Sequence, residues 1–232
     1  MTETSALARP QAQAGTIQLW SDLLDPFAHV ALTRLRAARE QAGLTGKLHV
    51  DHHVFPLELF NGPHPRTGTD SEAVGLGQIE PDAGFRLWTA PEWEYPSTVL
   101  LAAEAVLAAK TQGLAASEDL DYALRIAFWT DSRSIAHRAV ILEVAEETGT
   151  VDVDELAEAL DSGKHRADVM ADYAIAKTDE VNGSPHLFLA DGSNVNNPGI
   201  TVHWQGDWAK GFPVVTAHDS TWAADMVERA AA

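Results

Sequence analysis

The sequence predicts an α/β protein in which both ends of the chain build one mixed sheet and an all-helical insertion lies between them. Three observations lead to this class. Apolar and polar residues alternate, as in strands, at 16–20 and again from residue 186 onward. Residues 83–176, in between, carry several helical patterns without a strand pattern. The hydrophobic fraction of 45% and the charged fraction of 22% are those of an ordinary globular domain.

The N-terminal part has the pattern of a βαβ unit. The strand at 16–20 is followed by a short loop, and Asp25 and Pro26 then indicate a helix start. An Asp side chain accepts hydrogen bonds from the free amides of the first turn, and Pro suits the first helical position. Gly43 is a candidate C-cap, and a second strand is expected at 47–57. A helical crossover makes the two strands parallel.

The insertion is expected at 61–177 and begins with a loop over 61–77, which is rich in Gly, Pro, Thr and Asp. Its expected helices cover residues 95–110, 117–130, 134–148, 153–161 and 164–177.

The C-terminal part returns to strand patterns. A strand is expected at 186–190, and Asp191 with Gly192 predicts a hairpin turn. A final helix is expected to begin near Asp219 or Ser220. We therefore expect one domain formed by residues 15–60 and 178–232, preceded by a disordered leader at 1–14.

The charge and the residue counts exclude several functions. The formal net charge is −18, from 34 acidic and 16 basic residues, which disfavours nucleic acid or an anionic membrane as partner. No apolar run approaches the length of about 20 residues needed to span a bilayer. The chain has no cysteine, so it has no disulfide, no thiolate metal site and no thiol nucleophile of its own. We expect a cytoplasmic protein.

Two motifs carry a resemblance to a known family. Residues 21–29, SDLLDPFAH, resemble the active-site turn of the DsbA family, where a Cys-Pro-x-Cys motif starts a helix. Residues 183–189, GSPHLFL, resemble that family's Gly-x-Pro segment before its third strand. The resemblance implies a thioredoxin-like fold with an all-helical insertion. It also implies a cis peptide bond before Pro185, with this proline facing the helix start.

The chain departs from this family at both cysteine positions. Asp25 stands where the nucleophilic cysteine is found, and Ala28 where the second one is found. Neither residue can form a mixed disulfide, so ordinary thiol exchange by this chain is excluded. The turn is also similar to the Ser-Pro-Tyr turn of kappa-class glutathione transferases and 2-hydroxychromene-2-carboxylate isomerases. In these enzymes bound glutathione supplies the thiol, and a helix start stabilises the anion.

These resemblances imply a low-molecular-weight thiol as cofactor. Glutathione and mycothiol are the two candidates, the second because the composition is rich in Ala and acidic residues. The expected partner is a small-molecule thiol or its conjugate, and a homodimer is compatible with the sequence. The reaction would be thiol-dependent transfer, isomerisation or reduction. The alternative is a redox-dead pseudoenzyme, or a module that binds a peptide or small molecule without chemistry.

The candidate site has two groups of residues. Asp25 and His29 are the candidate catalytic residues, because i,i+4 spacing on a helix would let them form an acid–base pair. The candidate ligand-binding residues are Ser21, Pro26, Phe27, Ser184 and Pro185. Asp25 has two possible roles, a helix cap alone or a functional group. A charged Asp25 would repel a thiolate unless one of the two were protonated.

Two other patterns concern metal binding and a cleft lined by tryptophans. His52 and His53 are adjacent, but neighbouring residues of a strand point to opposite faces, so we expect no metal site. Trp88, Trp93 and Trp129 could line a cleft beside the insertion, and the alternative is that they belong to the ordinary core.

Overall fold

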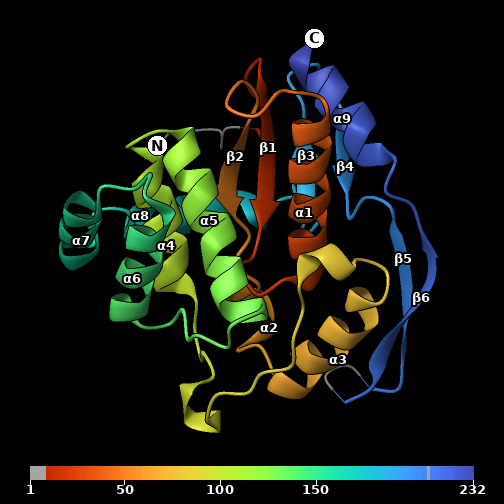
Figure 1. Ribbon diagram of the computed structural model, residues 1–232, viewed down its shortest axis with the longest axis horizontal. Coiled ribbons are helices and arrows are strands. Elements are labelled where there is room, and N and C mark those ends of the chain that lie inside the picture. Colours follow the sequence, from red (N-terminus) through yellow and green to blue (C-terminus); the bar gives the residue numbers. More distant parts are fainter. Residues whose placement is uncertain (1–8, 208–209) are drawn as a thin grey trace, which may run out of the picture.

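A computed structural model describes residues 9–207 and 210–232, so most of the expected leader lies outside the described residues. A four-stranded mixed sheet forms its centre, in the order β2-β1-β3-β4 (Figure 1). Strands β1 and β2 are parallel, whereas β3 is antiparallel to both β1 and β4. The strands comprise β1 Thr16–Ser21, β2 His49–Val54, β3 His186–Phe188 and β4 Asn194–Asn196. Both ends of the chain thus build one sheet, as the sequence predicts.

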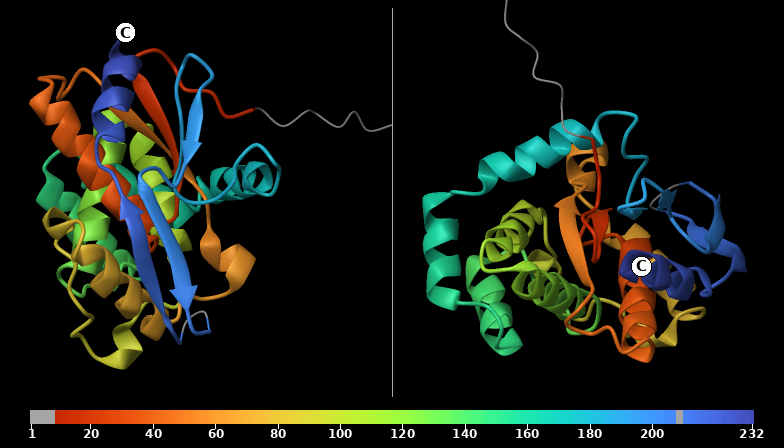
Figure 2. Two further views of the ribbon diagram at one scale, coloured as in Figure 1. Left: turned by 90° about the vertical axis from the view of Figure 1, so that its right-hand side faces the viewer. Right: turned by 90° about the horizontal axis from the view of Figure 1, so that it is seen from above.

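Helix α1 (Pro26–Gln41) makes the crossover between the two parallel strands, and α9 (Trp222–Ala231) packs beside it (Figures 1 and 2). Apolar side chains of both helices form one core cluster with the central strands. This cluster includes Ile17, Leu19, Leu35, Leu187 and Val227. The apolar face of α1 therefore fixes the helix against the sheet and sets the position of its first turn.

The insertion lies beside the β2 edge of the sheet (Figure 1). Its long helices occupy the predicted positions and differ from the expected bounds mainly at their first residues. They are α4 Leu100–Lys110, α5 Leu114–Trp129, α6 Arg138–Thr148, α7 Val153–Ser162 and α8 Arg166–Ala176. They enclose a second core built around Leu120, Leu124 and Trp129. None of the helices in the described part of the chain is long and apolar enough to span a bilayer.

The segment 61–77, expected to be a loop, is mostly helical. Helix α2 (Leu57–Asn61) is followed by α3 (Arg66–Gly77), and short 3₁₀ turns η1 (Pro81–Ala83) and η2 (Glu92–Glu94) come next. Tertiary packing overrides the local Gly content, because Gly75 lies where Pro213 approaches. A Cβ atom at Gly75 would be 3.2 Å from the Pro213 side chain. The loop expectation was therefore wrong for α3.

A second sheet was not predicted. Strands β5 (Ile200–Gln205) and β6 (Phe212–His218) form an antiparallel pair that stands apart from the central sheet, beside α3 (Figures 1 and 2). Pro198 and Gly199 precede β5, and Gly211 and Pro213 lie at the start of β6, so the strand pattern is interrupted in the sequence. The pair inserts between the expected hairpin and α9.

Candidate functional site

The two motifs of the sequence meet at the start of α1. Gly183 has a φ of 141°, a conformation that a residue with a side chain rarely adopts, and it leads into the cis peptide bond between Ser184 and Pro185. The Ser184 hydroxyl donates a hydrogen bond of 2.5 Å to Oδ2 of Asp25. It also accepts a hydrogen bond of 2.9 Å from the backbone N–H of Asp22. Asp25 and Ser184 are therefore brought together, as expected for this fold.

Asp25 caps the helix that follows it. Its Oδ1 accepts a hydrogen bond of 2.8 Å from the backbone N–H of Phe27, and Pro26 occupies the first helical position. Both carboxylate oxygens of Asp25 thus have a partner, although the residue is only 3% exposed. The cap role is confirmed, and the bond to Ser184 adds an interaction that a cap does not require.

The side chain of Asp22 connects the turn before α1 to the start of α2. Its two carboxylate oxygens accept hydrogen bonds from the backbone N–H groups of Leu24, at 2.7 Å, and Leu57, at 2.8 Å. His64, in the loop before α3, places Nε2 3.4 Å from Oδ1 of Asp22. Asp22 therefore fixes the turn and attracts the imidazole of His64.

A buried arginine of the insertion forms hydrogen bonds to the turn before α1. Arg125 on α5 donates hydrogen bonds of 2.8 Å to the carbonyl oxygen of Asp22 and to the hydroxyl of Ser21. Asp121 forms an ion pair with it at 2.7 Å. Ser21 therefore points to Arg125 in the interior and lies outside the cavity beside Asp25, so the structure does not place it with the other predicted ligand-binding residues.

A cavity of about 200 Å³ opens at the start of α1. Its lining combines apolar side chains with three titratable groups and one amide: Leu24, Asp25, Pro26, Phe27, Leu57, Asn61, Gly62, His64, Glu72 and Ser184. Four of the predicted site residues line it, and Pro185 follows Ser184 with its carbonyl oxygen bonded to the N–H of Asn197 at 2.8 Å. His64 and Glu72 were missed because their segment was taken for a loop, where no helix face could be assigned.

Burial and neighbouring charges raise the pKa of all three titratable groups of the cavity. Desolvation raises the pKa of Asp25 to about 6, against the lowering effect of the bonds from Ser184 and Phe27. Burial, together with the charge of Asp25, raises the pKa of Glu72 to about 8. Burial opposes the charged form of His64, but the Asp22 carboxylate outweighs it, so the pKa of His64 is raised. At neutral pH the cavity therefore holds an ionised Asp25 and a protonated Glu72.

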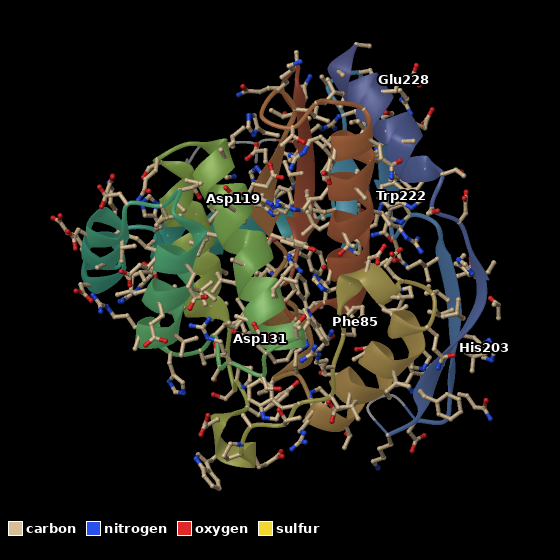
Figure 3. The ribbon with its side chains drawn as sticks, viewed as in Figure 1. Phe85, Asp119, Asp131, His203, Trp222 and Glu228 are labelled. Atoms are coloured by element: carbon tan, nitrogen blue, oxygen red, sulfur yellow. The ribbon has the colours of Figure 1, made fainter. Side chains whose placement is uncertain are left out.

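His29 does not join this site. Its Nε2–H donates a hydrogen bond of 2.8 Å to the carbonyl oxygen of Ala83, and its ring centroid lies 5.1 Å from that of Phe85, which Figure 3 labels below the first turns of α1. The ring of Trp129 stacks at 6.3 Å. Burial lowers the pKa of His29 to about 4, so the imidazole is neutral. The expected acid–base pair with Asp25 is wrong, because the helix turns His29 into an aromatic core.

The remaining candidates are structural. Trp88 and Trp129 belong to the core of the insertion, whereas Trp93 is 83% exposed, so these residues do not line a common cleft. His52 faces Asp121 in the interior, and the ring of His53 stacks on that of Trp20 in β1. Within residues 9–207 and 210–232, no three His, Asp or Glu side chains are arranged to hold a metal ion.

Comparison with known proteins identifies the family. Residues 16–203 match the DSBA-like thioredoxin domain, and the chain belongs to this family. A search of curated proteins finds no match. Among solved structures, a probable DsbA oxidoreductase from Streptomyces coelicolor is similar, with a TM-score of 0.66 and 18% identity over 93% of this chain and 89% of the other.

Two further structures share the fold. The cytosolic disulfide reductase DsbM from Pseudomonas aeruginosa, solved with GSH, has a TM-score of 0.52 and 21% identity over 78% of this chain and 89% of the other. A 2-hydroxychromene-2-carboxylate isomerase has a TM-score of 0.58 and 18% identity over 78% and 87%. This protein is therefore a member of the DSBA-like thioredoxin-domain family whose sequence contains no cysteine.

Proposed function

We propose that this protein binds a low-molecular-weight thiol, glutathione or mycothiol, in the cavity at Asp25 and supports thiol-dependent transfer, isomerisation or reduction. One observation carries the proposal. A buried carboxyl group with a pKa of about 6 occupies the helix start where the family has its cysteine, and it faces a cavity. The solved complex of DsbM with GSH, a member of the same fold, is consistent with a small thiol.

The residues of the cavity fit a bound thiol if the S–H proton of the thiol is transferred to Asp25. A bound thiol would supply the nucleophile that the chain itself lacks. Asp25, ionised at neutral pH, accepts the S–H proton on a carboxylate oxygen and then donates a hydrogen bond from its neutral form. The net charge of the cavity is the same before and after the transfer. The repulsion between carboxylate and thiolate is thereby avoided.

The remaining contacts orient the ligand. Pro26 and Phe27 offer apolar contact, and the backbone of Ser184 would pair with an extended thiol such as a tripeptide. Ser184 also holds Asp25, so this residue links the ligand-binding segment to the proton acceptor. A cytoplasmic location belongs to the proposal, because cellular glutathione is kept reduced there.

A thermal-shift titration tests the proposal. Glutathione and mycothiol are added to the wild type and to Asp25→Asn, which keeps the cap but cannot accept a proton. A thiol present at 100 times its Kd stabilises the wild type by about 2.7 kcal/mol. Asp25→Asn is expected to bind the thiol less tightly. Absence of any shift with either thiol, at concentrations up to tens of millimolar, contradicts the proposal and favours the redox-dead pseudoenzyme.

A further inference from the structure

A second cavity, of about 570 Å³, lies between α3 and β6 and shares no lining residue with the cavity at Asp25. One wall is a single face of α3, and the other is the whole length of β6 (Figures 1 and 2). The lining residues are Ser71, Val74, Gly75, Gln78, Ile79 and 212–218. We call this space the α3–β6 groove. The family match ends at residue 203, before β6 begins, so the family relationship does not account for the groove.

Strand β6 turns an unpaired backbone edge to the groove. Among the described residues the ribbon has two strands, so β6 pairs with β5 along one edge alone. Pro213 has no N–H, and a proline within a strand stands where its nitrogen points away from the paired neighbour. Its carbonyl oxygen lies on the α3 side, 3.4 Å from the place of a Cβ atom at Gly75. Because backbone groups alternate along a strand, the N–H and C=O of Val215 point to the same edge.

The side chains of the groove are apolar or uncharged. None of the lining residues is Asp, Glu, Lys or Arg, although these four types make up 22% of the chain. Val74 on α3 and Phe212 on β6 are half exposed, one on each wall. A free strand edge beside an apolar helix face suits an extended peptide, whose backbone pairs with the edge while alternate side chains enter the groove.

Shape and charge disfavour a second copy of this chain as the occupant. The free edge of β6 is recessed beside α3, and the β6 of a second copy would bring its own α3. The two helices would therefore collide before the two edges could pair. Each copy also carries a net charge of −18, so two copies repel each other. A flexible segment of another protein meets neither obstacle.

We propose that the α3–β6 groove binds an extended peptide segment of a partner protein, antiparallel to β6, with apolar alternate side chains and a basic residue at its N-terminal end. The antiparallel direction places that end beside Asp219, which follows β6. The exposed carboxylate of Asp219 accepts hydrogen bonds of 2.9 Å from the N–H and from the hydroxyl of Thr221, and so is held in place to attract the basic residue. This binding does not depend on a thiol at Asp25.

A phage-displayed library of random short peptides, panned on the purified wild type, tests the proposal. The enriched peptides are expected to alternate apolar side chains after a Lys or Arg. Val74→Asp places a carboxylate in the wall of the groove and should weaken their binding about tenfold or more. Met170→Asp on α8 is the matched control, because Met170 and Val74 are both 51% exposed, and it should bind like the wild type.

The backbone pairing and the charge are tested on one enriched peptide. Two copies of it are methylated on alternate backbone nitrogens, one copy for each edge of the extended peptide. The copy that cannot donate to β6 should lose binding, whereas the other should keep it. The bound peptide should also slow hydrogen exchange at the N–H of Val215. Asp219→Asn should weaken binding about two- to fivefold, as expected for an exposed ion pair.

Several outcomes would overturn the proposal. One is that no peptide is enriched on the wild type relative to Val74→Asp, and another is that both methylated copies bind equally well. A wild-type dimer in sedimentation that Val74→Asp abolishes would assign the groove to a second copy instead. Displacement of the peptide by glutathione would place it at Asp25. Should Val74→Asp melt well below the wild type, Phe212→Asp on the other wall replaces it in every comparison.

Discussion

The hydroxyl of Ser184 donates a hydrogen bond to the carboxylate of Asp25, and so joins the residue before the cis proline to the residue before α1. The same hydroxyl accepts from the N–H of Asp22. One small side chain thus satisfies a buried amide and a buried carboxylate that belong to the same turn. This bond holds the carboxyl group of Asp25 at the edge of the cavity.

Ser184→Ala is expected to destabilise the protein by about 2 kcal/mol, because it leaves the Asp22 amide and one Asp25 oxygen without a partner. Urea unfolding measures the loss. Ser97→Ala, at an exposed position, is the control and should be neutral within about 0.5 kcal/mol. Equal stability of the two variants would contradict the assigned role of Ser184.

Asp25→Asn is expected to change the pH dependence of stability. The folded pKa of Asp25, about 6, lies above the ordinary Asp value of 3.8. The folded state therefore holds this proton more tightly, and the stability gained from it is fully present below about pH 4 and lost as the pH rises through 6. Asn caps a helix about as well as Asp and carries no charge. Relative to the wild type, the unfolding free energy of Asp25→Asn should rise by about 2 kcal/mol between pH 4 and pH 7. A parallel pair of curves would mean that Asp25 is not buried in solution.

Asp25→Ala tests the cap itself. Ala accepts no hydrogen bond, so the N–H of Phe27 loses its partner at a cost of about 1 kcal/mol. Asp25→Ser retains a cap and should be more stable than Asp25→Ala at pH 4, and neither variant carries a charge at this position. Thermal unfolding of both variants at that pH provides the comparison, and the opposite order of stability would contradict the cap.

Arg125→Met is expected to be strongly destabilising, by about 3–5 kcal/mol, because Asp121 would remain as an unpaired buried charge. The double variant Asp121→Leu/Arg125→Met should recover part of this loss, since both charges are then gone. Denaturant unfolding measures all three proteins. A single variant as stable as the double one would show that the ion pair is not buried as described.

The protein alone is expected to show no insulin-reductase and no dithiol-oxidase activity, because it contains no sulfur nucleophile. The assay is run with purified protein, without glutathione or another small thiol, beside a cysteine-containing DsbA protein as positive control. Turnover in the absence of any thiol would require a different mechanism.

The sequence by itself determined the order of the elements and the position of the turn. Asp25 and Pro26 predict the start of α1 because helix capping is a local interaction, and the alternation of 16–20 predicts β1 for the same reason. The absence of cysteine excluded thiol exchange by the chain without any structure. The proline motif, through its resemblance to a family, predicted which distant segment meets the turn.

Only the tertiary structure decided which side chains share the cavity. Helix α3 forms despite its glycines because its apolar side is buried, and this brings Glu72 to the cavity next to Asp25. His29 has suitable spacing from Asp25 but points into an aromatic core, since the packing of α1 against the insertion fixes its direction. Periodicity gives the spacing of residues along an element, whereas the face that an element turns to a cavity depends on contacts between distant parts of the chain.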